Sequence, residues 1–188
     1  MSTLLFIAAY PFTHCTDRKR TCQLWDSVSG ASEKPRVLDS LPCAFYHSGT
    51  MEPYIHKVQY YETDRMQITH HSNYIRFMEE ARVDFLEKIG WGYDKMEAEG
   101  IMSPVVSLSC DYKKTTSFPD RISIAVTVKK CTAVKLTLGY TMSVGSTVVC
   151  TASSVHCFIN AEGHPLVIEK VFPAFYRDLK ALEDEAGL

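Results

Sequence analysis

Residues 74–159 contain one helical pattern followed only by strand patterns, and this order most constrains the fold. Apolar side chains recur at spacings of three, four and seven, which predicts a helix of about 17 residues with one face on a core. Ser72 or Asn73 is suited to cap its start, and Gly90 to end it. The apolar positions are Tyr74, Phe77, Met78, Ala81, Phe85 and Leu86.

Strand patterns lie on both sides of this helix. Tyr54–Glu62 alternates before it, a short helical turn is expected over Tyr93–Glu99, and Phe172–Leu182 is read as a strand end or a helix. Turn residues separate the extended segments between them, as at Gly145-Ser146. The extended segments are Val105–Lys113, 122–128, 134–142 and Val148–Ile159.

One long helix followed by an antiparallel meander predicts an α+β domain in which the sheet wraps around the helix. A cystatin-like or a ferredoxin-like layout also joins helices to a meander. A ferredoxin-like fold needs a second full helix between later strands, and residues 101–159 offer no pattern for one. We therefore favour the single wrapped helix.

Composition and charge exclude several classes of partner. The 188 residues carry a net charge of −2, so no broad basic surface is expected and nucleic acid is not a predicted partner. No stretch approaches the ~20 apolar residues of a membrane span, and the apolar run at residues 4–10 lacks the basic start of a signal peptide. The seven cysteines form no Cys-x-x-Cys pair, so we expect reduced thiols in a cytoplasmic protein.

Residues 1–50 differ in pattern from the rest of the chain. They show no sustained helical or strand period, so we expect a poorly ordered extension there and one folded domain over residues 51–188. Two other hypotheses remain open. Met51 is the biological start, or the segment is a regulatory or docking tail.

The segment between the first strand and the helix carries the most specific motif. It reads Tyr60-x-x-Thr63-Asp64, with His71 seven residues after the aspartate. Asn73-Tyr74 and the run 77–82 (Phe-Met-Glu-Glu-Ala-Arg) follow, with Cys-Asp-Tyr at 110–112 and Phe-Pro-Asp at 118–120. In these features the chain resembles the 4-hydroxybenzoyl-CoA thioesterase family of hotdog-fold enzymes, especially its branch of small bacterial acyl-CoA thioesterases.

The resemblance implies a hotdog fold and hydrolysis of an acyl-CoA or acyl-carrier-protein thioester, without a metal or redox cofactor. It also implies a homodimer or homotetramer with active sites at the subunit interface. Several family members have glycines two or three residues after the aspartate, where this chain has Met66-Gln67. Side chains there narrow the acyl pocket or alter the loop, which affects substrate size more than reaction type.

Asp64 is the expected catalytic carboxylate. It can attack the thioester carbonyl to form an anhydride, or deprotonate a water molecule, and the sequence does not separate these routes. Negative charge then develops on the carbonyl oxygen, and the N–H groups of a helix N-terminus near residues 71–73 can stabilise it. The alternative for Asp64 is a turn or capping residue of the loop.

The other candidate site residues have less certain roles. His71 either uses its ring to orient the aspartate or water, or contributes only its backbone N–H, and a metal site at His70-His71 lacks a third ligand at a telling spacing. Glu79 and Glu80 fall off the apolar stripe, which favours solvated or salt-bridged roles over the helix-borne base of another hotdog subfamily. Expected substrate contacts are Met66, Asn73, Tyr74 and Met78. Lysines and arginines at 113–114, 121, 129–130 and 135 are candidates for holding CoA phosphates.

Two rival functions were weighed against hydrolysis. A hotdog hydratase or dehydratase needs an Asp-x-Asn-Pro-x-His or a Gly-His-Phe signature, and neither occurs in the sequence. A non-catalytic acyl-CoA-binding hotdog protein is the other rival, and the presence of Asp64 argues against it.

Overall fold

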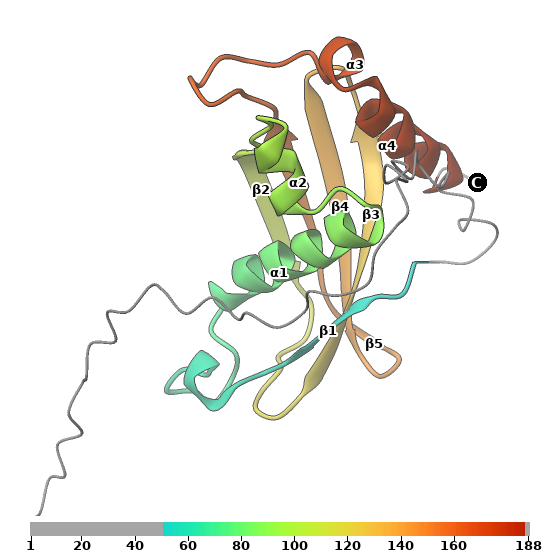
Figure 1. Cartoon of the computed structure of the whole chain (residues 1–188). Coiled ribbons are helices and arrows are strands. Elements are labelled where there is room, and N and C mark those ends of the chain that lie inside the picture. Colours follow the sequence, from blue (N-terminus) through green and yellow to red (C-terminus); the bar gives the residue numbers. More distant parts are fainter. Residues whose placement is uncertain (1–50, 187–188) are drawn as a thin grey trace, which may run out of the picture. The chain divides into compact units, whose positions relative to one another are not determined.

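Helix α1 (Asn73–Lys88) lies across one face of a curved antiparallel sheet (Figure 1). The structure is a computed structural model and describes residues 51–186, so the expected extension over residues 1–50 lies outside the described residues. Along the sheet the strand order is β1-β3-β4-β5-β2. The strands are β1 (Tyr54–Lys57), β2 (Val105–Tyr112), β3 (Arg121–Cys131), β4 (Lys135–Val144) and β5 (Thr147–Cys157).

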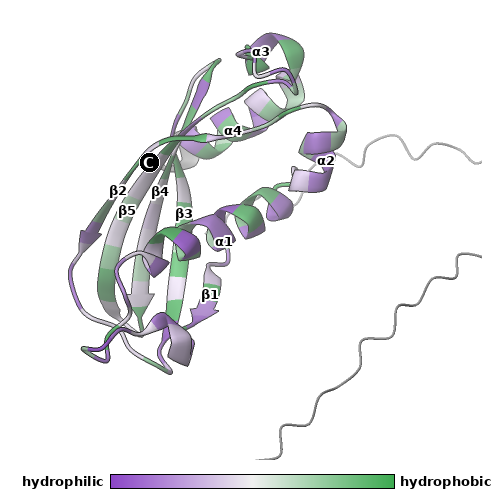
Figure 2. Cartoon of the chain, turned by 90° about the vertical axis from the view of Figure 1, so that its left-hand side faces the viewer, coloured by the Kyte–Doolittle hydropathy of each residue, from purple (hydrophilic) through white to green (hydrophobic). Residues whose placement is uncertain are grey.

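The core lies between α1 and the concave side of the sheet, as Figure 2 shows. All six apolar positions predicted for the helix are buried. The facing side of β3 contributes Ile122, Ile124 and Val128, which alternate with more exposed residues as a half-buried strand requires. The predicted α+β layout, with a sheet wrapped around one long helix, is therefore confirmed.

Three shorter helices complete the fold. The expected turn after α1 is the helix α2 (Tyr93–Ala98). At the C-terminal end α3 (Ile168–Val171), which the sequence pattern did not predict, precedes α4 (Pro173–Ala186), and α4 packs against β3. No helix in residues 51–186 is long and apolar enough to cross a membrane.

The first strand is shorter than predicted. It ends at Lys57, and residues Tyr60–Glu62 form a 3₁₀ turn where a strand over Tyr54–Glu62 was expected. The Gln59 N–H donates to the Glu62 carboxylate at 2.7 Å, and the Glu62 N–H donates back to the Gln59 carbonyl at 3.1 Å. This reciprocal pair closes the turn and directs the following loop toward the start of α1.

The two ends of α1 differ in how they are capped. Ser72 occupies the N-cap position in a helical conformation and makes no side-chain cap, so the expected capping by Ser72 or Asn73 is wrong. Gly90 has φ +77° and donates its N–H to the Glu87 carbonyl, which confirms the predicted glycine termination.

The edge strand β2 leaves apolar side chains exposed. Val105, Val106 and Leu108 are each more than 40% exposed, and the next strand in the order, β5, covers only one side of β2. An edge strand with apolar side chains offers unpaired backbone groups and apolar surface together.

A buried polar network crosses from α1 to the sheet. Arg82 is bound by Glu79 through Nε and Nη2, and its Nη1 donates to the Ser103 carbonyl and to Nδ1 of His156. Burial and the neighbouring Arg82 guanidinium lower the pKa of His156 to about 4. His156 is therefore neutral in the folded protein at pH 7, and it fixes the position of α1 over β5.

We predict that His156 makes the fold acid-sensitive. The unfolded chain protonates this residue near its ordinary pKa of 6.5 and the folded chain only near 4, so stability present above pH 6.5 is lost as the pH falls toward 4. Between pH 7 and pH 4.5 the wild-type protein should lose about 2–3 kcal/mol more free energy of unfolding than His156→Gln. Urea unfolding at both pH values measures this difference, and equal losses in the two proteins would contradict it.

Candidate active site

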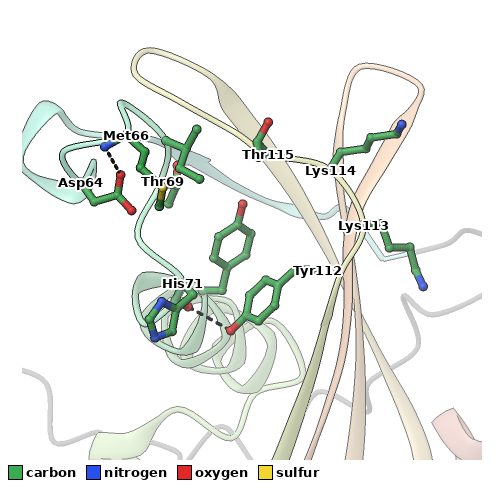
Figure 3. Close-up of a pocket in the computed structure, with 10 residues that line it drawn as sticks. Asp64, Met66, Thr69, His71, Tyr112, Lys113, Lys114 and Thr115 are labelled. Carbon is green, nitrogen blue, oxygen red and sulfur yellow. Dashed lines mark hydrogen bonds between the residues drawn. The ribbon is translucent and has the colours of Figure 1, made fainter.

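A cleft of about 330 Å³ lies where the loop before α1 meets the end of β2 (Figure 3). Four of the six predicted site residues line it: Asp64, Met66, His71 and Tyr74. The cleft also contains six further residues, of which only Lys113 and Lys114 were named from the sequence, as phosphate candidates. These six are Ile68, Thr69, Tyr112, Lys113, Lys114 and Thr115. The far wall is the segment that follows β2.

Asp64 is half-buried in the loop that precedes α1. Its Oδ1 accepts the Met66 N–H at 2.7 Å, and its backbone binds Ile68 and Gln67 across the turn. Asp64 is thus a turn residue, as the simpler interpretation held, but that turn uses one carboxylate oxygen. Figure 3 shows the other oxygen turned away from the Met66 amide.

Glu62 ties this loop to the helix start. Its carbonyl oxygen accepts hydrogen bonds from the His70 N–H at 2.9 Å and from Nδ2 of Asn73 at 2.8 Å. Its buried carboxylate lies 3.0 Å from Nε2 of His56, whose other ring nitrogen lies 2.8 Å from Glu80. His56 also stacks on the core residue Phe77 with a centroid separation of 3.9 Å, so the loop is anchored to the sheet and to α1 together.

A second attachment joins the loop to the segment after β2. The Thr69 N–H donates to the Thr116 carbonyl at 2.7 Å, and the two threonine hydroxyls lie 2.7 Å apart. The Tyr74 hydroxyl lies 2.9 Å from the same Thr116 hydroxyl. Burial raises the pKa of Tyr74, so its phenol stays protonated at neutral pH. The sequence contains no signal for this contact, because residues 69 and 116 are far apart along the chain.

His71 lines the cleft just before α1 and is joined to Tyr112 on β2. The ring is exposed and lies 4.2 Å from the ring of His70. The Tyr112 hydroxyl donates to the His71 carbonyl at 3.1 Å. No side chain caps α1 from its N-cap position, but two N–H groups there already have acceptors: the Ser72 N–H donates to Nδ1 of His70 at 3.4 Å, and the Asn73 N–H donates to the His70 carbonyl at 2.9 Å.

The family model of the Thioesterase-like superfamily matches residues 58–180, about two thirds of the chain. The chain belongs to the Thioesterase-like superfamily.

Similar bacterial proteins support this family membership. A candidate acyl-CoA thioesterase of Bacillus subtilis strain 168, YneP, is 30% identical over 122 residues, which cover 64% of this chain and 88% of that protein. A candidate esterase of Aquifex aeolicus strain VF5 is 34% identical over 106 residues, 56% of this chain and 83% of that protein. The solved DHNA-CoA thioesterase of Staphylococcus aureus superposes with a TM-score of 0.68 at 27% identity, over 73% of this chain and 95% of that one. The chain is therefore a hotdog-fold thioesterase, an enzyme that hydrolyses thioesters.

Two predicted substrate-binding residues of this thioesterase lie outside the cleft. Asn73 is buried and its side chain bonds Glu62, while Met78 lines a different cavity farther along α1. Glu79 binds Arg82, and Glu80 accepts from Tyr54 at 3.0 Å and contacts His56. The salt-bridged role is confirmed for Glu79, whereas Glu80 hydrogen-bonds Tyr54 and His56 and pairs with no arginine among residues 51–186.

The cationic side chains named as phosphate candidates are divided by the fold. Lys113 and Lys114 belong to the cleft, and in Figure 3 their amino groups extend outward from its wall. Arg121, Lys129 and Lys135 lie on β3 and β4 and do not line it.

Gln67 holds a strained backbone within the Asp64 loop. Its φ of +63° is left-handed, a conformation that costs a non-glycine residue about 1–2 kcal/mol. The Ser117 hydroxyl donates to its carbonyl at 2.6 Å and helps to hold it there. A glycine at this position would adopt the same backbone conformation without that cost.

We predict that glycine stabilises the protein more than alanine at position 67, the reverse of the usual order within a helix. Gln67→Gly should be more stable than Gln67→Ala by about 1 kcal/mol, because both lack the side chain but only alanine keeps the left-handed penalty. Denaturant unfolding of the two variants provides the measurement. The matched pair at Glu87, exposed within α1, should show the usual order with alanine more stable. The same order at both positions would contradict the assigned strain.

Proposed function

We propose that this thioesterase hydrolyses an acyl-CoA thioester in the cleft between the Asp64 loop and β2, with Asp64 as nucleophile or general base. One observation supports this most strongly. Asp64 lines the same cleft as His71 and Tyr74, which flank the start of α1. A thioester carbonyl between Asp64 and this helix start meets a negative oxygen on one side and N–H donors on the other.

The turn around Asp64 gives this carboxylate a fixed position. The Met66 N–H binds Oδ1, which leaves Oδ2 for the carbonyl carbon or for a water molecule. The oxyanion then forms beside the first turn of α1, where the helix dipole adds positive potential. One oxyanion donor is worth roughly 10²–10³ in rate.

A CoA ester is the proposed substrate for two reasons. The Bacillus relative and the Staphylococcus structure are both named for CoA thioesters. Lys113 and Lys114 also give the outer wall of the cleft a positive charge, which suits the phosphates of CoA. An acyl-carrier-protein arm is the alternative carrier.

We also propose that two copies pair through the edge strand β2. A second strand would pair with the free backbone edge of β2, and the two sheets would then be continuous. Because Tyr112 lies on β2 and lines the cleft, this pairing would bring the partner close to the site.

We predict that Asp64→Asn abolishes most of the activity without loosening the loop. The asparagine oxygen can still accept the Met66 N–H, but a neutral amide is neither a base nor a nucleophile. In a thiol-release assay with aliphatic and aryl acyl-CoAs, kcat/KM should fall by about 10²–10⁴. Asp94→Asn, an exposed carboxylate on α2, is the matched control and should keep wild-type activity. A variant at Asp64 that keeps more than a tenth of the activity would remove this carboxylate from the mechanism.

Isotope labelling separates the two roles of Asp64. Single-turnover hydrolysis in ¹⁸O-water is followed by mass analysis of the peptide that contains this residue. Label in the carboxylate identifies an anhydride opened at the aspartyl carbonyl and hence the nucleophile, whereas label found only in the product acid is the result expected for a base that activates water.

We predict that His71→Ala lowers kcat by about tenfold, because His71 lines the cleft and its imidazole is proposed to orient the attacking group. His70→Ala is the matched control, since its ring bonds Ser72 at 2.8 Å and does not line the cleft. Steady-state kinetics with one acyl-CoA compares the two variants. A loss of kcat below threefold for His71→Ala would limit the catalytic contribution of this residue to its backbone groups.

A further inference from the structure

A second cavity of about 230 Å³ lies farther along α1, where the helix faces β2, β4 and β5. Its apolar walls come from Ile75, Met78, Val105 and Leu108. Tyr140, Ser154 and His156 also line it, and each of these three is no more than 3% exposed. The cavity therefore joins a largely apolar space to a buried polar group.

The direction of the hydrogen bonds in this polar group follows from Arg82. Its guanidinium is always protonated and can only donate, so Nδ1 of His156, 3.1 Å from Nη1, must accept. The other hydrogen of Nη1 is directed to the Ser103 carbonyl at 3.2 Å. The neutral imidazole then carries its hydrogen on Nε2 and donates it to the Ser154 hydroxyl at 2.7 Å.

The hydroxyl groups of Tyr140 and Ser154 together carry one hydrogen more than their mutual hydrogen bond uses. The Tyr140 and Ser154 hydroxyls lie 2.9 Å apart, and a single hydrogen fills that contact. Each hydroxyl carries one hydrogen, and burial, which raises the pKa of Tyr140 to about 12, keeps the phenol protonated. One O–H of this pair is therefore left over. Because both residues line the cavity, that hydrogen is available to a ligand there.

This arrangement also excludes Ser154 as a nucleophile. A serine activated by histidine must donate its hydrogen to the ring, whereas here the ring donates to the serine. The pair therefore recognises a ligand rather than attacking it.

The second cavity is aligned with the active-site cleft along the same helix. Tyr74 lines the cleft and Met78 lines the second cavity, and four residues of helix span about 6 Å. The Cys110 thiol of β2 lies 3.6 Å from the sulfur of Met78. Methionine is unbranched and adaptable, so this contact can yield to an acyl chain that runs from one cavity to the other.

We infer that the second cavity holds the far end of the acyl group, and that the Tyr140–Ser154 hydroxyl pair selects an acyl group carrying a neutral hydrogen-bond acceptor, such as a keto oxygen. This inference rests on the proposed function, since it takes the thioester carbonyl to lie beside Asp64. An anionic acceptor is disfavoured, because Glu79 lines the same cavity and already neutralises Arg82.

Matched pairs of acyl-CoAs test the selection. Each pair has an unbranched chain of six, eight or ten carbons, with either a methylene or a keto group at the penultimate carbon. The wild-type enzyme should prefer the keto member by at least about tenfold in kcat/KM at one of these lengths. The double variant Tyr140→Phe/Ser154→Ala should reduce this preference to less than about threefold. Tyr176→Phe, on α4, removes a phenol that lines neither cavity and should keep the preference.

A bulky substitution in the wall of the second cavity tests independently whether the acyl chain occupies that cavity. Leu108→Trp adds bulk at the wall without touching the hydroxyl pair, so it should shorten the longest acyl chain that is cleaved. Circular dichroism and thermal unfolding establish that each variant is folded.

Several results would overturn the inference. No keto preference at any length would do so, and this is the result expected if a second copy of the chain closes the cavity. A preference that survives the double variant, or a chain-length limit unchanged by Leu108→Trp, would also do so. If the wild-type enzyme cleaves none of the esters, the proposed function fails. Calorimetric dissociation constants of the same pairs then report on the cavity by themselves, with the same tenfold ratio expected.

Discussion

Glu62 joins the first strand, the catalytic loop and the central helix through both its main chain and its side chain. Its carboxylate is only 6% exposed and is held by His56 and the Gln59 N–H, while its carbonyl binds His70 and Asn73. A buried carboxylate without partners is strongly destabilising, so these contacts form together with the fold. The position of Asp64, two residues later, depends on them.

In the proposed mechanism one aspartate serves both the geometry of the turn and the reaction. A carboxylate has two oxygens, and the loop uses only one of them, through the Met66 amide. The hydrogen bond that fixes the loop would therefore also fix the free oxygen proposed to react, without a separate side chain to hold it. Catalytic groups that are held in place in this way lose little conformational entropy when substrate binds. The strained backbone at Gln67 is found in the same turn, where the chain reverses toward α1.

The sequence predicted what depends on local spacing. The apolar stripe of α1, the alternation of β3 and the glycine that ends α1 are local patterns, and each was found as expected. The Thr69–Thr116 and Tyr112–His71 contacts were not foreseen, because they depend on strand register across more than 40 residues. Asn73 had been read as a substrate contact, since an amide beside a catalytic loop can serve a ligand or the backbone equally well. Only the distance to the Glu62 carbonyl distinguishes these uses.

The exposed edge of β2 has a consequence for how stability should be understood. If a second chain pairs with this edge, the folded state is a dimer. The fraction of folded protein then depends on the protein concentration. The midpoint of thermal unfolding would then rise with protein concentration. Dilution would separate the two chains at β2, the strand that also contributes to the cleft. The activity per chain would therefore fall along with the stability.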